Sequence, residues 1–224
     1  FAAIDIGSYD VILEIFEISK KQGIRSVDKI CHRMELGKDT YTLGKIRPEM
    51  EEELCRVLAD FVRIMEGYRV DDYRATASSA ISEASNSLYV LGKIHQLTGL
   101  SVTVLSNSEQ RFLSYKALAA MEDNFNKIIE KGTAILDLDG GSFQISLFDK
   151  DALVTTQNIR MGSLRIRERL AGIQSETEHY EEMVEELIWN EVSSFKKMYL
   201  KDRKIENIML IGDVFTDSVY QNIE

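Results

Sequence analysis

Short apolar runs, several of them alternating with polar residues, are typical of β-strands. Residues 2–6 read AAIDI and are followed by the turn GSYD and a second run, VILEIFEI. Two such runs joined by a short turn predict a β-hairpin. Further strands are predicted at YRATA (73–77), LSVTVL (100–105), GTAILDLD (132–139), FQISLFD (143–149), ALVTTQNI (152–159) and IENIMLIGD (205–213).

Other segments space their apolar residues as a helix does. Residues 49–66 follow Pro48, which suits the first turn of a helix, and one face carries Leu54, Val57, Leu58, Phe61 and Met65. A helix is also predicted over ISEASNSLYVLGKIHQL, closed by Gly99, and another from a capping Ser108 to about Met121. A long helix is predicted over 176–199, with an interior face of Tyr180, Met183, Val184, Leu187, Ile188 and Phe195.

Alternating strands and helices indicate an α/β fold. AIDIGS at 3–8 and ILDLDGGS at 135–142 share an order of apolar residue, Asp, apolar residue, glycine and serine, and both begin a predicted hairpin. This weak internal repeat predicts a duplicated domain with a cleft between the copies. The alternative is a chance similarity, because any buried strand that ends in a glycine turn has this pattern. We expect a first lobe over 1–125 and a second lobe, cut short after its last strand, over 126–224.

Composition narrows the class of protein. The chain has 224 residues, is 44% hydrophobic and has one proline, which is typical of an ordered globular protein. No apolar run approaches the roughly 18 residues of a membrane span, and the first residues lack the basic start of a signal peptide. Cys31 and Cys55 have no metal or redox spacing, so we expect reduced thiols in a cytoplasmic protein.

A formal net charge of −10 disfavours non-specific binding to nucleic acid. It does not exclude a phosphate ligand held by backbone N–H groups, which add no net charge. The acidic stretch ETEHYEEMVEE is predicted to be a solvated helix face, with a partner-binding helix as the alternative. A homodimer is left open, and the three scattered histidines are not expected to be catalytic or to bind metal.

The two glycine turns are the strongest candidates for chemistry. Gly7 with Ser8, and Gly140 and Gly141 with Ser142, follow buried strands. Glycine lets the backbone approach an anion closely, and consecutive N–H groups in such a turn form an anion-binding nest. The serine hydroxyls can add donors, so both turns are predicted to bind phosphate.

An aspartate stands near the end of the strand before each turn: Asp5 in the first copy and Asp137 in the second. Carboxylates in such positions commonly hold Mg²⁺, often through water, and the metal bridges phosphate oxygens. Two turns that each have such an aspartate predict a site for a phosphoryl group.

Three long segments resemble one known family: AAIDIGSYDVILEIFEI, ATASSAISEASNSLYVLGKIHQLTGLSVTVLSNSEQRFLSYKAL and TAILDLDGGSFQISLFDKDALVTTQNIRMGSLRIRERL. They are similar to the exopolyphosphatase/guanosine pentaphosphate phosphohydrolase (Ppx/GppA) family, within the actin, sugar kinase and heat-shock chaperone ATPase superfamily. The resemblance covers essentially the whole chain. SEASN with the following TGLSVTVLSNSEQ is specific to this family within the superfamily.

The resemblance implies two ribonuclease H-like lobes with mixed sheets. It also implies hydrolysis of terminal phosphoanhydrides of polyphosphate or guanosine pentaphosphate with Mg²⁺. In such proteins a glutamate activates the attacking water, and the two glycine turns hold the phosphates.

The chain departs from the family at the residues that carry catalysis. The expected Glu-Glu pair reads Glu109-Gln110, and the base is the second of the pair. In the second turn, Asp139 replaces a glycine, Phe143 a threonine and Gln144 a glutamate. An amide cannot take a proton from water, and losing a general base costs about 10² to 10⁴ in rate.

Other departures affect the phosphates themselves. Tyr9 and Asp10 replace Asn and Ser in the first turn, and Ser82 replaces an arginine. Hydrolysis of a polyanion needs clustered cations. The candidates, each with solvated surface charge as the alternative, are Arg74, Lys93, Arg111, Arg160, Arg165 and Arg167.

Three functions follow from these residues. The favoured one is a degenerate family member whose hydrolysis of polyphosphate or guanosine pentaphosphate is weak or lost, and its alternative is a non-enzymatic phosphate-ligand sensor or partner-binding pseudoenzyme. The second is a hydrolase that is reduced but active, with Asp139 or Asp10 as a relocated base. The third is an ATP-dependent kinase, disfavoured because LIGDVF at 210–215 has only one glycine for an adenosine site.

Overall fold

The computed structural model describes residues 1–21, 23–121, 124–174, 179–201 and 203–212. The chain divides into two compact units, residues 1–110 and residues 111–224. The division falls within helix α5 (Asn107–Met121). The lobe boundary that we predicted, at residue 125, lies inside the second unit.

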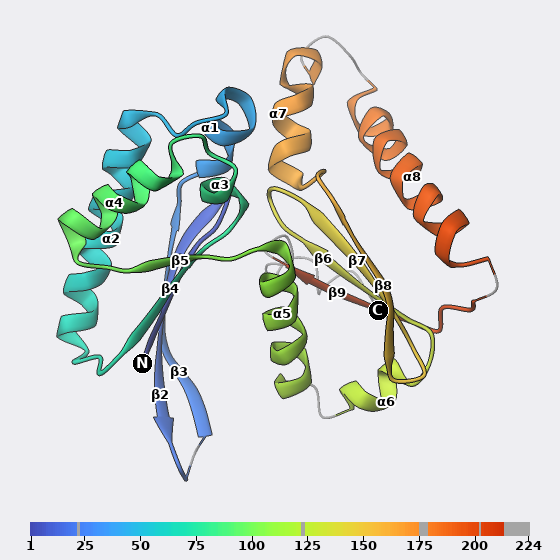
Figure 1. The fold of residues 1–224 in the computed structure, drawn as a ribbon, viewed down its shortest axis with the longest axis horizontal. Coiled ribbons are helices and arrows are strands. Elements are labelled where there is room, and N and C mark those ends of the chain that lie inside the picture. Colours follow the sequence, from blue (N-terminus) through green and yellow to red (C-terminus); the bar gives the residue numbers. More distant parts are fainter. Residues whose placement is uncertain (22, 122–123, 175–178, 202, 213–224) are drawn as a thin grey trace. The chain divides into compact units, whose positions relative to one another are not determined.

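The first unit is a five-stranded mixed sheet, sheet A, in the order β3-β2-β1-β4-β5 (Figure 1). Strands β1 to β3 are antiparallel neighbours, whereas β4 pairs parallel with β1 and β5 parallel with β4. The strands are β1 (Ala2–Ile6), β2 (Asp10–Ser19), β3 (Gly23–Arg33), β4 (Tyr73–Ala77) and β5 (Val102–Val104). The helices are α1 (Leu36–Leu43), α2 (Pro48–Gly67), α3 (Ser79–Ser82) and α4 (Ser87–Thr98).

One continuous apolar core holds this unit together. The helical face predicted for residues 49–66 is confirmed, because all five of its apolar side chains are buried in α2. Alternate residues of β1, namely Ala2, Ile4 and Ile6, join the same core. Asp5 lies between two of them, so its side chain is on the opposite face of the sheet, and it is exposed.

The SEASN motif contributes a buried polar network. Asn86 donates to the carbonyl of Ile46 (2.8 Å) and to Glu51 (2.9 Å), and it accepts the Ile46 N–H (3.0 Å). Lys93 lies 3.4 Å from the buried Glu51 carboxylate. Lys93, a candidate cation, is therefore engaged in neutralising a buried charge within the fold.

The second unit repeats the topology of the first. Sheet B has the order β8-β7-β6-β9, in which β6 to β8 are antiparallel neighbours and β9 pairs parallel with β6. This confirms a duplicated α/β fold with mixed sheets. The strands are β6 (Thr133–Leu138), β7 (Phe143–Asp149), β8 (Ala152–Ile159) and β9 (Asn207–Gly212). The helices besides α5 are α6 (Phe125–Ile129), α7 (Ser163–Gln174) and α8 (Tyr180–Tyr199).

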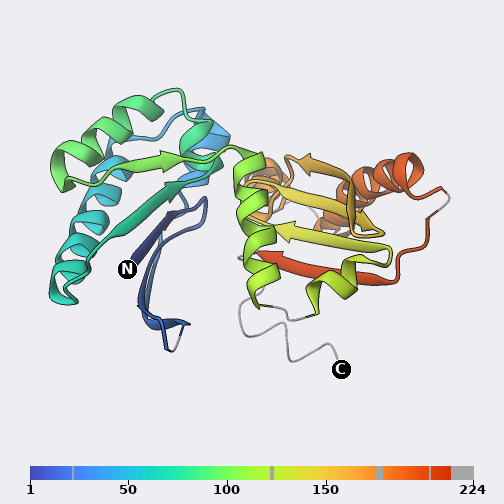
Figure 2. The ribbon, with the colours of Figure 1, turned by 60° about the horizontal axis from the view of Figure 1, so that its bottom comes forward.

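Helices cover both faces of sheet B (Figures 1 and 2). On the face next to α5 and α6, Phe148 makes edge contacts with Tyr115 and Phe125, at centroid distances of 5.2 and 6.4 Å. On the face next to α8, Phe195 packs with Ile145 and other apolar strand residues. Most of the buried apolar side chains described in this unit thus form two smaller clusters rather than one continuous core, and Leu164, Ile166 and Leu170 of α7 are buried outside both.

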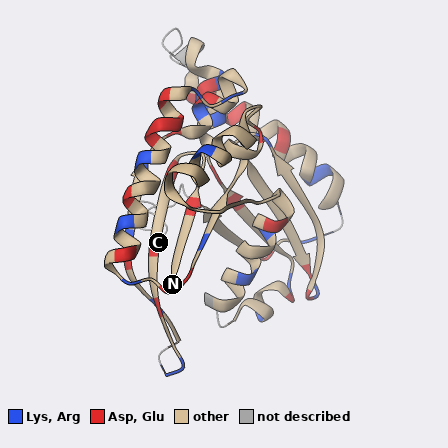
Figure 3. Cartoon of the chain, turned by 60° about the vertical axis from the view of Figure 1, so that its left-hand side comes forward, with Lys and Arg blue, Asp and Glu red and all other residues tan. Residues whose placement is uncertain are grey.

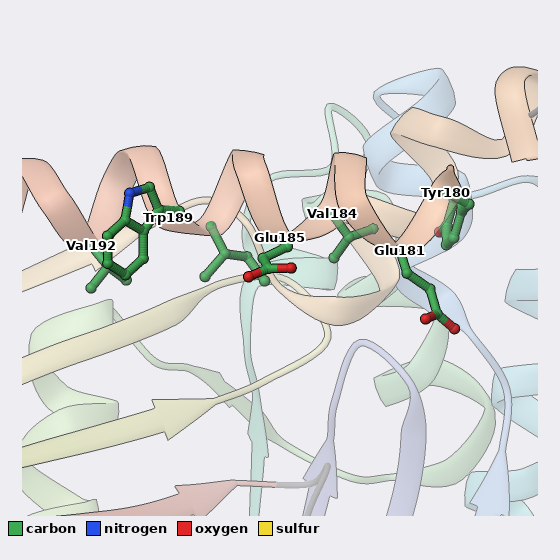
Figure 4. Close-up of a pocket in the computed structure, with 7 residues that line it drawn as sticks. Tyr180, Glu181, Val184, Glu185, Trp189 and Val192 are labelled. Atoms are coloured by element: carbon green, nitrogen blue, oxygen red, sulfur yellow. The ribbon is translucent and has the colours of Figure 1, made fainter. Parts of the chain in front are cut away.

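The interior face predicted for the long helix is confirmed in part: Tyr180, Met183, Val184 and Leu187 are half-buried rather than buried. Phe195 is the only described residue of α8 that is buried, whereas Ile188 is 37% exposed and Trp189 is 63% exposed. An apolar cavity of about 790 Å³ between α8 and sheet B, lined by Tyr180, Val184, Ile188 and Phe195, leaves this face incompletely packed. Figure 4 shows Val184 and Val192 among the α8 side chains that line a neighbouring pocket with the acidic Glu181 and Glu185.

Several elements were missed by the sequence pattern: β3, α1, α3, α6 and α7. Strand β3 is an edge strand with mostly exposed side chains, so it lacks a clear apolar alternation. Three of the missed helices have eight residues or fewer. The predicted strand residue Asp213 and the predicted helix start at 176–178 lie outside the described residues.

Acidic and basic residues are interspersed along the described helices in Figure 3. None of the helices in the described part of the chain is both long enough and apolar enough to cross a membrane.

Candidate functional site

The second glycine turn is closed by its own backbone. It connects β6 to β7, and the N–H of Asp139 donates to the carbonyl of Ser142 (3.0 Å). The Asp139 carboxylate accepts the N–H of Gly140 at 2.5 Å. This contact stabilises the turn, so Asp139 has a structural role beside its proposed role as a relocated base. Gly140, Gly141 and Ser142 are all buried.

Helix α7 packs its N-terminus directly onto this turn. The N–H groups of Ser163 and Arg165 donate to the carbonyls of Asp139 (3.3 Å) and Gly140 (3.1 Å), and the Arg165 guanidinium donates to the carbonyl of Gly141 (2.8 Å). The turn carbonyls are therefore engaged by α7, and N–H groups are what the turn can offer an anion. Arg165, a candidate cation, fixes the turn.

Gly162 makes this close packing feasible. A Cβ atom at Gly162 would lie 2.3 Å from the carbonyl oxygen of Asp139 and 2.4 Å from the backbone nitrogen of Ser142. The sequence reasoning overlooked this residue. Its signal was a glycine immediately before a helix, in MGSLR.

A polar row crosses sheet B beside the turn. Asp137 of β6 is directly opposite Gln144 of β7, and Gln144 is directly opposite Asn158 of β8. Directly opposite residues point to the same face of a sheet. The structure therefore brings the predicted residues Asp137 and Gln144 together and adds Asn158, which the sequence reasoning did not select.

Burial changes the pKa of Asp137 and removes water from the amide oxygens of Gln144 and Asn158. Burial raises the pKa of the Asp137 carboxyl, and the hydrogen bond from Ser114 of α5 (3.2 Å) partly opposes that rise. Gln144 is 4% exposed, and its amide oxygen is buried and has no hydrogen-bond partner among the residues that the structure describes. The amide oxygen of Asn158 is in the same condition. The row thus offers oxygen acceptors to a ligand.

Helix α5 anchors the same face of the sheet further along. Tyr115 donates to Ser146 (2.5 Å), and Arg111 donates to Thr156 (3.2 Å). Thr156 and Ser146 hydroxyls lie 3.3 Å apart. Arg111, another candidate cation, is therefore bonded to the sheet.

The first glycine turn, in the first unit, is also closed by a backbone hydrogen bond and leaves no room for a Cβ at its glycine. The N–H of Gly7 donates to the carbonyl of Asp10 (2.9 Å), and a Cβ at Gly7 would lie 2.9 Å from that oxygen. Arg33 stacks on the ring of Tyr9, 4.1 Å from its centroid, and donates to its hydroxyl. The Asp5 carboxylate accepts a hydrogen bond from Thr76 (3.3 Å).

The Ser8 hydroxyl lies inside the first unit. Ser8 is fully buried, and its oxygen is 2.7 Å from the Tyr41 hydroxyl and 3.2 Å from the Ser79 hydroxyl. Tyr41 and Ser79 are themselves 2.8 Å apart. This triangle of hydroxyls ties the turn to α1 and α3. A direct contact between the Ser8 hydroxyl and phosphate stays a prediction.

Glu109 is part of a helix cap. Its carboxylate accepts the backbone N–H (2.9 Å) and the hydroxyl (2.7 Å) of Ser106, and the Glu109 N–H donates to the Ser106 hydroxyl (3.3 Å). This reciprocal pattern is a capping box, so Ser106 rather than the predicted Ser108 caps α5. Gln110 follows Glu109 in the first turn, and its N–H donates to the Ser106 carbonyl (2.9 Å).

We expect Ser106→Ala to lower stability by about 1 kcal/mol, as the loss of an N-cap does. Ser108→Ala should cost clearly less, because position 108 lies within the helix and alanine is the better helix former. Chemical denaturation of the three proteins measures the difference. Equal losses for both variants would contradict the assignment of the cap.

The capping box should also respond to acid. The backbone and side-chain hydrogen bonds from Ser106 lower the pKa of Glu109 in the folded state. A depressed pKa contributes stability above the unfolded-state pKa, and this contribution is lost as the pH falls through the folded-state pKa. The stability difference between the parent and Glu109→Gln should therefore shrink from about pH 7 to about pH 3. A difference that stays constant would contradict it.

Comparison with known proteins gives a consistent picture. Residues 14–224 match the model of the Ppx/GppA phosphatase family. The chain is 22% identical over 174 residues to a bifunctional 3-dehydroquinate synthase/phosphatase of Fusobacterium nucleatum, covering 75% of this chain and 26% of that protein. It is 25% identical over 144 residues to exopolyphosphatase 1 of Mycobacterium leprae, covering 64% of this chain and 41% of that protein.

The fold of the chain also matches that of a solved structure from this family. The crystal structure of the Ppx/GppA family member of Aquifex aeolicus superposes with a TM-score of 0.70 at 23% identity, covering 96% of this chain and 66% of the other. The chain thus spans about two thirds of that solved structure and less than half of each of the two curated relatives.

Proposed function

The chain belongs to the Ppx/GppA phosphatase family, whose model matches residues 14–224, and we propose that it binds a polyphosphate-type ligand and hydrolyses it slowly or not at all. Membership supports phosphatase-type chemistry on phosphoanhydrides. Polyphosphate and guanosine pentaphosphate are the proposed ligands.

One observation carries the proposal of weak hydrolysis: a buried amide, that of Gln144, stands directly opposite Asp137. The resemblance places a glutamate at this position and another at Gln110. An amide oxygen can accept a hydrogen bond from water but cannot take its proton at neutral pH. Water next to Gln144 would be oriented without being activated, and that deficit is about 10² to 10⁴ in rate.

The residues of the second unit fit a divalent cation such as Mg²⁺. Asp137 offers a carboxylate, and Gln144 offers an amide oxygen that has no partner among the described residues. Oxygen donors of this kind are what Mg²⁺ and Ca²⁺ prefer. When bound there, the cation would neutralise phosphate oxygens.

The chain's own groups would then divide the work of binding. The N–H groups of Gly141 and Ser142 would hold phosphate oxygens, and α7 holds that turn in place through Arg165. Asp137 would hold the cation. Gln144 would orient water by a hydrogen bond. Asp5, Gly7 and Ser8 are proposed for the equivalent turn of the first unit.

Two measurements on the unmodified chain test this function. Calorimetric titration with long-chain polyphosphate and with guanosine pentaphosphate, with and without Mg²⁺, should show Mg²⁺-dependent binding. Phosphate release from both compounds should stay near the uncatalysed background. Rapid metal-dependent release would overturn the weak hydrolysis. Absence of binding to either compound would overturn the ligand assignment and favour a role in partner contacts.

A further inference from the structure

The proposed function makes no use of the cavity between α8 and sheet B. Its volume of about 790 Å³ lies within the usual range of small-molecule sites. Its walls are mainly apolar, with Leu136 and Ile145 of sheet B and Val184 and Ile188 of α8 among the lining residues. Apolar walls cannot hold water by hydrogen bonds, and side chains that border a gap lose packing contacts. An apolar molecule of matching size would supply those contacts.

The cavity is elongated. Along β6 it extends from Ala134 to Asp139, which corresponds to roughly 17 Å at the rise of a strand. Along α8 the lining residues run from Tyr180 to Lys196, which corresponds to roughly 24 Å at the rise of a helix. A long apolar space of this kind fits an extended alkyl chain.

The shape and the walls of the cavity disfavour a protein segment. The volume and the length along β6 give a mean cross-section of roughly 46 Å², whereas a helix about 10 Å across needs roughly 79 Å². An extended peptide is thinner, but it would bury N–H and C=O groups against walls that offer them few partners. An alkyl chain has no such groups.

The charge at one end of the cavity favours an anionic head group there. Lys196 is the one basic residue among the described residues that line the cavity. It is exposed, so its ammonium group reaches water while its methylene stem lines the cavity. No carboxylate stands three or four positions away from it along α8, so it has no ion pair of that spacing within the helix. The Asp139 carboxylate, by contrast, already accepts the Gly140 N–H.

The chain that follows α8 places Lys196 and Asp139 at opposite ends of the cavity. The N–H of Arg203 donates to the carbonyl of Leu200 (3.4 Å), and the N–H of Glu206 donates to the carbonyl of Gly132 (2.7 Å). The C-terminal end of α8 therefore lies near the start of β6, whereas Asp139 follows the end of β6.

We propose that the cavity binds the alkyl chain of a long-chain fatty acid, with the carboxylate at the ammonium group of Lys196. The alkyl chain would run along β6 toward the second glycine turn. The inference does not rest on the proposed function, because the cavity needs neither phosphate nor a cation. Each buried methylene group strengthens binding about fourfold, so affinity should rise with the length of the alkyl chain until the cavity is filled.

The first test uses palmitate as the probe, titrated below its micelle concentration into the unmodified chain and followed by displacement of a fluorescent fatty acid. Palmitate should bind, and the shorter laurate should bind at least about tenfold more weakly. Ala134→Phe should weaken palmitate binding at least about tenfold, because the added ring fills part of the cavity. Ala152→Phe is the matched control, since it adds the same ring at an exposed position of β8 and should bind palmitate as the parent does.

The second test concerns the head group. Lys196→Gln should weaken palmitate binding about fivefold, the upper end for an exposed ion pair. It should leave the binding of the uncharged palmityl alcohol unchanged. Lys197→Gln removes the same charge from the neighbouring position, which does not line the cavity, and should leave the binding of both compounds unchanged.

Two results would overturn the inference: no displacement of the fluorescent fatty acid by palmitate from the parent, or equal palmitate affinity in the parent and Ala134→Phe. Equal affinity in Lys196→Gln and Lys197→Gln would overturn the position of the carboxylate. Circular dichroism checks each fold, and if Ala134→Phe does not fold, Val184→Trp fills the same cavity from α8 and replaces it. Because no phosphate compound is present, loss of polyphosphate binding would contradict the proposed function without affecting this result.

Discussion

The double variant Gln110→Glu, Gln144→Glu should release phosphate from long-chain polyphosphate about 10² to 10⁴ times faster than the parent, in the presence of Mg²⁺. The reason is the chemistry of the base. Each substitution replaces an amide with a carboxylate of nearly the same shape, so the change adds a proton acceptor with little change in volume. The rate of phosphate release, measured at saturating polyphosphate, checks the prediction.

The new negative charge at position 144 should also lower the stability of the folded protein. It would lie directly opposite Asp137, and like charges at opposite positions of a sheet repel each other. The double variant should therefore be less stable than the parent without Mg²⁺ and should recover stability when Mg²⁺ is added. The control is Gln157→Glu, which places a carboxylate on the other face and should leave phosphate release at the parent level. A silent double variant that still binds polyphosphate would contradict the prediction.

Gly162→Ala should disrupt the second glycine turn. The free energy of unfolding should fall by about 1–3 kcal/mol, the usual cost of overpacking. The added Cβ would lie 2.3 to 2.5 Å from backbone atoms of Asp139, Ser142 and Gly140, and backbone cannot move aside as the end of a flexible side chain can. The N-terminus of α7 would have to lift from the turn. Its hydrogen bonds to the turn carbonyls would then lengthen or break. Chemical denaturation measures the loss, and polyphosphate binding should weaken with it.

Gly172→Ala is the matched control for Gly162→Ala. Gly172 lies in the same helix, and a Cβ there would meet none of the described residues within 4 Å. In a helix interior alanine is favoured over glycine by up to about 1 kcal/mol, so this variant should be as stable as the parent or slightly more. A Gly162→Ala protein that matches Gly172→Ala in stability would mean that α7 does not depend on close contact with the turn.

Features of the fold that depend on residues close together in the sequence could be predicted from the sequence alone. The strand–turn–strand units at both glycine turns and the buried face of α2 follow from local periodicity and were confirmed. The opposition of Asp137 and Gln144 belongs to the same class, because a four-residue turn fixes the register of the two strands that it joins.

Features that depend on distant segments could not be predicted in this way. The partners of Ser8, namely Tyr41 and Ser79, lie 33 and 71 residues away. Asn158 joins the polar row only through the register of β8 on β7. The exposure of Ile188 depends on how α8 packs, and apolar periodicity alone cannot report that. Glu109 was the exception, since Ser106-x-x-Glu109 is a capping signature that could have been recognised in the sequence.

The difference between the apolar cores of the two units has a consequence for the order in which they fold during synthesis. The first unit has one continuous core, whereas the second divides its buried apolar residues between two faces of a sheet and leaves a cavity under α8. During synthesis the N-terminal part leaves the ribosome first, and domains generally fold as units in that order. The better-packed half can therefore be complete before the strands of the second are available.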